Sequence, residues 1–223
     1  MPVQTNIDTV VATFQMGKHL AESGIPMNEL FSRLNKFEPR YRSVAFEGAS
    51  MGVALTHGLE AWKAYAKLAE NHATQVHIGL GWAIAEKQLD LASTLSSVAP
   101  QMQVKVLDGY GYWFGLFQRR ATIRTQQIPA FITPEYQAGF DQGVGRAIWY
   151  ITKGEAAKVQ HIISYFPEAR RADLWQGIGV ALTYVGGCSD ERLRKLRSVS
   201  GDHRPNVDTG IASAKGSMHL ALS

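Results

Sequence analysis

The sequence has few of the features that identify a disulfide-bonded, metal-binding, membrane or secreted protein. Cys188 is the one cysteine in 223 residues, which excludes an intrachain disulfide framework and a zinc or iron–sulfur site built on several thiolates. The longest uncharged stretch, 174–189, has 16 residues with four glycines, too short and too polar for a membrane span. Neither a basic start nor a long apolar run follows Met1, so no signal peptide is predicted. We therefore expect a cytoplasmic protein.

The sequence also has no large excess of positive or negative charge. The formal net charge is only +4, and the basic residues are scattered in small groups such as Arg119–Arg120, which argues against a nucleic-acid partner. The seven histidines show no i, i+4 pairs, and no phosphate loop or dinucleotide fingerprint occurs, so neither a metal nor a cofactor is expected. Hydrophobic residues at 45% are enough to build a core, which excludes intrinsic disorder.

A short motif of small residues recurs six times. It has the form Gly-x-small, as in the strings HIGLG, DQGVG and WQGIG, and it returns every 30 to 34 residues, a spacing typical of stacked supersecondary units. Glycine inside a helix costs about 1 kcal/mol relative to alanine, so its return at a fixed register indicates close helix crossings. The first glycines of the motifs are Gly48, Gly79, Gly109, Gly143, Gly177 and Gly210.

Helical patterns surround these motifs. An apolar helical stretch continues after each motif, and a second helix follows in most units, for example over 155–166 and over 190–199, the latter before Gly201. Residues 121–133 contain Pro129 and predict a loop or an irregular helix. The fold class predicted is all-α: a helix-hairpin repeat, or α-solenoid, of about five to six units of 30–34 residues.

Two further helices are predicted before the repeats, over 9–23 and 26–37. Asp8 is the expected N-cap of the first, and Gly24 is its expected stop. They would cap the first repeat.

The expected organisation is a single all-helical domain over 1–223. Its first part, 1–40, would hold the capping helices, and 41–223 would hold the repeats.

Two resemblances follow from these residues. The period and the hydrophobic-then-small pair of each motif resemble the tetratricopeptide pattern, although the consensus tryptophan is in register only at Trp175. The strings FEGASMG, LDGYGYWFG, FDQGVGRAIW and FPEARRADLWQGIGVALTYVGG resemble a bacterial family of unknown function whose members occur in enediyne polyketide biosynthetic clusters and also elsewhere. That resemblance covers about residues 10–220 and implies small-molecule biosynthesis without a settled reaction. Because its members are usually longer at the C-terminus, we expect this chain to lack a region that the family has.

Tetratricopeptide geometry would turn the residue before each motif glycine toward a concave face, which continues one helical turn further along. The face would combine two carboxylates, two amides, an arginine and aromatic rings, as a small-molecule pocket does. Catalytic roles are predicted for Glu47, Asp108 and Arg146. Substrate contacts are predicted for Trp82, Tyr110, Tyr112, Gln142, Trp149 and Gln176.

The roles of the charged residues follow from their chemistry. Glu47 and Asp108 are acid/base candidates because a carboxylate beside aromatic walls has a raised pKa. Arg146 would hold an anionic or enolate oxygen with two hydrogen bonds. Three alternatives are open: the polar groups satisfy helix ends and one another, Arg146 forms a salt bridge with Asp141 or Asp173, or the aromatic rings are core.

Two other features have competing interpretations. Residues 48–52 match the Gly-x-Ser-x-Gly elbow of serine hydrolases, which requires a strand such as 42–46 before it. Ser50 stands, however, where other units have Gly or Ala, which favours a packing role. His77 is similarly expected to be a packed, hydrogen-bonded residue rather than a catalyst.

The function predicted is natural-product biosynthesis, with a hydrophobic small molecule bound in a concave helical pocket. Cofactor-independent acid/base chemistry, such as cyclisation or isomerisation, would act on it. The alternative is a tetratricopeptide-like adaptor without catalytic activity, whose groove binds a peptide of a protein partner. The oligomeric state is open, with a homodimer among the possibilities.

Overall fold

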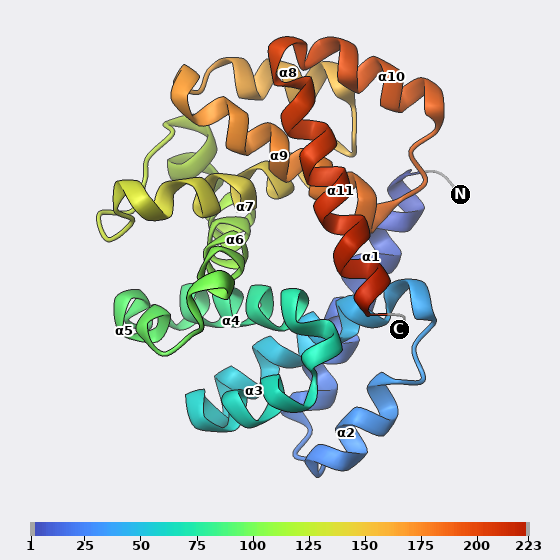
Figure 1. The fold of residues 1–223 in the computed structure, drawn as a ribbon, viewed down its shortest axis with the longest axis vertical. Coiled ribbons are helices and arrows are strands. Elements are labelled where there is room, and N and C mark those ends of the chain that lie inside the picture. Colours follow the sequence, from blue (N-terminus) through green and yellow to red (C-terminus); the bar gives the residue numbers. More distant parts are fainter. Residues whose placement is uncertain (1–2, 222–223) are drawn as a thin grey trace. The chain divides into compact units, whose positions relative to one another are not determined.

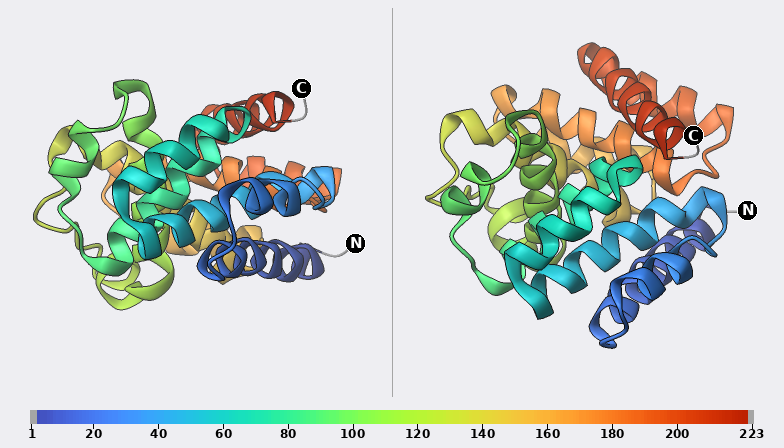
Figure 2. Two further views of the ribbon diagram at one scale, coloured as in Figure 1. Left: turned by 90° about the horizontal axis from the view of Figure 1, so that it is seen from below. Right: turned by 60° about the horizontal axis from the view of Figure 1, so that its bottom comes forward.

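The computed structural model describes residues 3–221, which are helical almost throughout, as Figures 1 and 2 show. No strand occurs among these described residues, which confirms the all-α class. The α-helices are α1 (Val3–Glu22), α2 (Met27–Leu34), α3 (Pro39–Leu68), α4 (Ala73–Lys87), α5 (Leu91–Ser96), α6 (Pro100–Phe117), α7 (Pro134–Thr152), α8 (Ala156–Ser164), α9 (Glu168–Val185), α10 (Asp190–Val199) and α11 (Arg204–Leu220). Short helices are the 3-10 turns η1 (Glu70–His72) and η3 (Gly201–His203) and the π-helix η2 (Arg120–Arg124).

Two compact units make up the described chain. Unit 1 consists of residues 3–7 and Gly111–Gly216, and unit 2 of Asp8–Tyr110 and residues 217–221. The unit boundaries therefore fall inside α1, α6 and α11. Long helices pack in pairs within each unit, α7 on α9 in unit 1 and α3 on α4 in unit 2 (Figure 1).

Glycines bring the helices of unit 2 into backbone contact. A Cβ atom built on Gly48 of α3 would lie 2.0 Å from the carbonyl oxygen of Phe14 in α1, and one on Gly17 would lie 2.0 Å from that of Ala45. Each helix thus presents a glycine to a carbonyl of the other, an arrangement that allows Cα–H···O contacts. The crossing of α4 and α6 repeats it with the pairs Gly81–Val106 and Gly109–Ile78.

The same reciprocal arrangement occurs in unit 1. Between α7 and α9, a Cβ atom on Gly145 would lie 2.1 Å from the Leu174 carbonyl oxygen, and one on Gly177 would lie 2.0 Å from that of Gln142. Among the motif glycines, Gly48, Gly79, Gly109, Gly177 and Gly210 thus lie at helix crossings with no room for a side chain, and in α7 the close contact is made by Gly145. The crossing of α9 and α11 uses the pairs Gly179–Val207 and Gly210–Gln176.

Most predicted helix ends agree with the structure. Gly24 follows α1 with a φ of 74°, and α10 has the predicted bounds and is followed by Gly201. The segment 121–133 is irregular as predicted, because the π-helix η2 gives way to a loop before α7.

Two local predictions were wrong. Asp8 is not an N-cap, because α1 begins at Val3, and the buried side chains of Val3 and Ile7 extend its apolar face upstream. The segment 42–46 is no strand but lies within α3. Helix α3 itself is interrupted at Gly58, whose φ of 79° separates a long first part from a shorter second part.

Candidate functional site

The predicted site residues are distributed over both units. Unit 2 contains Glu47, Trp82, Asp108 and Tyr110, and unit 1 contains Tyr112, Gln142, Arg146, Trp149 and Gln176.

Two carboxylates lie in the interior of unit 2. Glu47 in α3 is 4% exposed and Asp108 in α6 is 3% exposed. Both stand directly before a glycine of the motif. The Glu47 carbonyl oxygen faces Gly79 of α4, and Gly109 faces the carbonyl oxygen of Ile78 in α4. Because these crossings fix the backbone, each carboxylate projects from a rigid position, and carboxylates are rarely so buried unless they are paired.

Aromatic residues of unit 2 are buried as well. The ring centroid of Trp82 lies 4.9 Å from that of Phe14, so the indole packs against α1. Burial raises the pKa of Tyr110 far above its ordinary value. Its hydroxyl therefore stays protonated at neutral pH and can donate a hydrogen bond but cannot act as a base.

In unit 1, Arg146 lies over an aromatic ring. Its guanidinium carbon is 4.5 Å from the centroid of Tyr112, a cation–π distance, and its side chain is almost fully buried. The Tyr112 ring is in turn 5.4 Å from that of Tyr150. A cation held in this way is preorganised, which suits it to bind an anionic group of fixed geometry.

A half-buried carboxyl that was considered only as a salt-bridge partner also belongs to this region. Burial raises the pKa of Asp173 in α9, the negative charge of Asp141 raises it further, and the neighbouring amide of Gln142 lowers it. Asp173 precedes Gln176 by three residues and therefore shares its helix face. Unit 1 thus brings Asp173 of α9 close to Gln142 of α7. Gln142 in turn precedes Arg146 by one helical turn.

Trp149 has a packing role in the structure. Its side chain is 1% exposed, and a Cβ atom on Gly154 would lie 2.7 Å from the indole ring. The indole therefore supports the turn that follows α7, where Gly154 has a φ of 69°. This arrangement favours the alternative that this ring is core.

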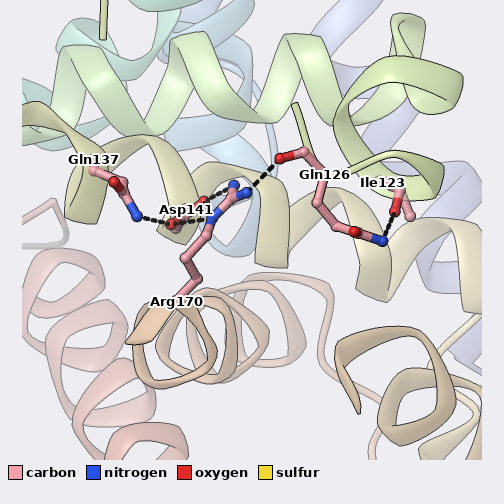
Figure 3. A network of polar contacts seen from close by, with 5 residues as sticks. All are labelled: Ile123, Gln126, Gln137, Asp141 and Arg170. Atoms are coloured by element: carbon pink, nitrogen blue, oxygen red, sulfur yellow. Dashed lines mark hydrogen bonds and ion pairs between the residues drawn. The ribbon is translucent and has the colours of Figure 1, made fainter. Parts of the chain in front are cut away.

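A buried ion pair joins α7 and α9, as Figure 3 shows. The Arg170 Nε donates to both carboxylate oxygens of Asp141, at 3.1 and 2.9 Å, and its Nη1 donates to the Gln126 carbonyl oxygen at 2.7 Å. Gln137 donates to the same carboxylate at 3.5 Å. Burial raises the pKa of Asp141, while the hydrogen bonds and charge of Arg170 lower it. Asp141 is thus paired with Arg170, a partner that was not considered for it from the sequence.

Neither a metal centre nor a membrane-spanning helix is found in the described part of the chain. No group of three or more His, Cys, Asp or Glu side chains between residues 3 and 221 could hold a metal ion. Within the same range, every helix is too short or too polar to cross a bilayer.

Comparison with known proteins gives a family but no activity. A family model described as "Protein of unknown function (DUF1702)" matches residues 1–221. The chain belongs to the DUF1702 family. This match confirms that the motifs are those of a family of unknown function. Searches of curated proteins and of solved structures found no match.

The serine-hydrolase interpretation of this DUF1702 chain was wrong. Ser50 lies inside α3 and is fully buried; its hydroxyl donates to the Val76 carbonyl oxygen at 2.5 Å and accepts from Trp62 Nε1 at 2.8 Å. The hydroxyl is therefore used twice for packing, and no strand precedes it as an elbow requires.

His77 has the packing role that was predicted. Its Nδ1 lies 2.7 Å from the Ala73 carbonyl oxygen, and its ring meets that of Trp62 edge to face. Burial lowers the pKa of His77, against the opposing effect of that backbone hydrogen bond, so the ring is neutral at physiological pH.

The sequence did not predict a site role or a structural role for three polar residues of the DUF1702 chain that the structure brings out: His72, Arg170 and Asp173. One signal could have found two of them. Counting back seven residues from the crossing glycine of α4 gives His72, and the same count in α9 gives Arg170. Polar residues at one register of a repeat are worth testing as a structural position, even where their types differ.

Proposed function

We propose that this chain binds a hydrophobic small molecule with an anionic or enolisable oxygen and transforms it by acid/base chemistry without a cofactor. The observation that carries the proposal is the half-buried carboxyl of Asp173, whose pKa is raised by burial, beside Gln142 of α7, which itself precedes the buried Arg146 by one helical turn. A carboxyl that remains protonated closer to neutral pH can act as a general acid.

The chemistry divides between the two charged residues. Arg146, stacked on Tyr112, would bind the substrate oxygen and stabilise the negative charge that develops on it. Asp173 would deliver a proton to a carbon or oxygen of the substrate, and Gln142 would orient the carboxyl. Cyclisation and isomerisation fit this division because they add and remove protons without an external oxidant or reductant.

The carboxylates of unit 2 have a role of their own in this proposal. Glu47 and Asp108 are buried on rigid helix crossings, and each is proposed as an acid/base group in unit 2. Their substitutions are therefore tested separately from those of unit 1.

The wider setting is also proposed. The reciprocal glycine contacts support a tetratricopeptide-like stacking of the helix pairs as a solenoid with the N-terminal helices as its cap. We propose a natural-product pathway of the enediyne or polyketide type, in the cytoplasm, on the basis of the sequence motifs. Cys188 is half-buried and its pKa is raised by burial, so it remains a thiol there.

The test is native mass spectrometry of the protein purified from its own host. We expect a co-purifying small molecule in the wild-type protein and its loss in Arg146→Gln. Asp173→Asn should retain the molecule, because the amide keeps its size, but should abolish turnover of it. The matched control is Asp202→Asn, which changes an exposed aspartate of unit 1.

Outcomes that contradict the proposal are distinct. If Asp173→Asn and Asp202→Asn turn over the isolated molecule equally, Asp173 is not the acid. If no small molecule is retained by the wild-type protein at any stage, the binding proposal is wrong. Glu47→Gln and Asp108→Asn are measured in the same assay, with melting temperatures expected within a few degrees of wild type, and simple unfolding of both would make them structural.

A further inference from the structure

The end of α6 and the segment after it have an unusual composition. Between Asp108 and Glu135 there is no acidic residue, whereas Arg119, Arg120 and Arg124 occur within it. All three arginines are exposed, and none of them forms an ion pair with another described residue. We call residues 113–131, all in unit 1, the arginine segment.

Exposed aromatic side chains accompany these arginines. Phe117 is 61% exposed and Phe131 is 54% exposed, two of the most exposed large hydrophobic residues of the described chain. The ring of the half-buried Trp113 lies 5.4 Å from that of Phe117, one helical turn away. Large apolar side chains in water are unfavourable, so exposed aromatic rings in the same segment as three exposed arginines indicate a binding surface.

The segment is also held in a defined conformation. The π-helix η2 is closed by Thr125 N, which donates to the Arg120 carbonyl oxygen, and Gln127 N donates to that of Ala121. Gln126 has a φ of 50°, and its carbonyl oxygen accepts from Arg170 of the buried ion pair. Such a preformed surface loses little conformational entropy when it binds. Short π-helical turns also occur often at functional sites.

Aromatic and arginine side chains together suit one kind of partner. At a membrane surface the aromatic rings enter the boundary between headgroups and acyl chains, while arginines bind the anionic headgroups. Neither contribution alone anchors a protein firmly, but two signals together do. We propose that the arginine segment docks the chain on a membrane surface that contains anionic lipids. This docking goes beyond the proposed activity, because it uses other residues and requires no substrate.

Vesicle flotation of the full chain tests the proposal. The probes are vesicles of equal parts phosphatidylcholine and phosphatidylglycerol, with phosphatidylcholine alone for comparison. The wild-type protein should float with the anionic vesicles only, and high salt should release it, because headgroup attraction is screened. Each basic residue near an anionic surface contributes about 1 kcal/mol, so the triple variant R119Q/R120Q/R124Q should bind at least about tenfold more weakly.

A matched control removes three exposed basic residues from another place in unit 1. The variant R192Q/R194Q/K195Q of α10 has the same net charge as the triple variant of the arginine segment and should bind like wild type. Phe117→Ser should weaken binding several-fold, whereas Tyr165→Ser, at a side chain that is 65% exposed, should not. Circular dichroism confirms that each variant is folded.

Two results would overturn the proposal. One is a wild-type protein that does not float with the anionic vesicles, a result that would leave an acidic protein as the better partner for this surface. The other is an equal loss of binding in the two triple variants, because net charge rather than the arginine segment would then explain the attraction.

Discussion

The crossing of α3 and α4 in unit 2 and that of α7 and α9 in unit 1 share a register but differ in the contact beside it. Seven residues before the crossing glycine stand His72, the last residue of η1 directly before α4, and Arg170 in α9. Two residues before the motif glycine of the facing helix stand Phe46 and Asp141. His72 stacks on Phe46 with the ring centroids 4.0 Å apart, whereas Arg170 forms an ion pair with Asp141.

The stacked pair and the ion pair differ because His72 and Arg170 have different further contacts. His72 Nδ1 lies 3.0 Å from the hydroxyl of Ser43, so its contacts stay within the helix pair. Arg170 has more donors, and one of them binds the carbonyl oxygen of Gln126 in the loop before α7. A guanidinium can satisfy a carboxylate and a third element together, which an imidazole cannot. We infer that the ion pair is used where a loop requires an anchor.

The largest expected effect comes from breaking the feature that the two crossings share. A Cβ atom on Gly177 would lie 2.0 Å from the Gln142 carbonyl oxygen, and one on Gly79 would lie 2.2 Å from that of Glu47. The clash is with backbone, so no side-chain rotation relieves it. Each substitution to alanine should lower the free energy of unfolding by about 5 kcal/mol, measured by urea denaturation.

The control for this prediction is an alanine at a glycine without close neighbours. Gly216 of α11 has no atom within 4 Å of a built Cβ. Gly216→Ala should be stabilising by up to about 1 kcal/mol, through helix propensity alone. Equal stability of Gly177→Ala and Gly216→Ala would contradict the crossing as described.

The ion pair comes next in size. Arg170→Met leaves the Asp141 carboxylate buried without its cation, which should cost about 4 kcal/mol of unfolding free energy. The double variant R170M/D141L should recover most of that loss, because it removes both charges. Limited proteolysis separates the cost of the unpaired charge from the loss of the loop contact. The loop around Gln126 should be cleaved faster in both variants, since neither keeps the Arg170 side chain that anchors it. A double variant as unstable as the single one would contradict this account.

The helical fold and the glycine register could be predicted from the sequence because both depend on local rules. A glycine that returns every 30 to 34 residues carries a repeated cost, and only a repeated backbone contact explains it. The contacts at Gly145 and Gly177 are of that kind. Ser50 could be read correctly for the same reason, as the residue in the place of a glycine. The start of α1 could not, since Asp8 is a good cap by type but apolar residues before it continue the helix.

The candidate site was harder to predict because side-chain partners depend on distant segments. Asp141 is separated from Arg170 by 29 residues and from the nearer Arg146 by only five, yet it binds Arg170. Sequence proximity therefore could not reveal Arg170 as a partner of Asp141. The raised pKa of Asp173 likewise arises from burial and from the charge of Asp141 on another helix. Neither cause is visible in the local pattern around Asp173.

A pH titration separates the two crossings further. Burial, together with the charge of Arg42, lowers the pKa of His72 to about 4, whereas an unfolded histidine titrates near 6.5. Between these two pKa values the unfolded state binds a proton that the folded state does not bind. The contribution of His72 to the free energy of unfolding is therefore fully present above about pH 6.5 and is lost as the pH drops toward 4. The loss should be about 3 kcal/mol. His72→Gln should flatten this slope in urea denaturation, and an unchanged slope would assign it to other groups.

The smallest effect is expected where unit 2 replaces a glycine by Ser50. The serine hydroxyl donates to the Val76 carbonyl oxygen, and it also accepts from Trp62 Nε1. Ser50→Ala keeps the Cβ that this crossing already accommodates but leaves the buried indole N–H without an acceptor, so it should cost about 1 to 2 kcal/mol of unfolding free energy. A double-mutant cycle with Trp62→Phe should give a coupling of about 1 kcal/mol, because the hydrogen bond from Trp62 Nε1 to the Ser50 hydroxyl is lost in either variant. Additive losses would mean that Ser50 acts through packing alone, as the glycines of unit 1 do.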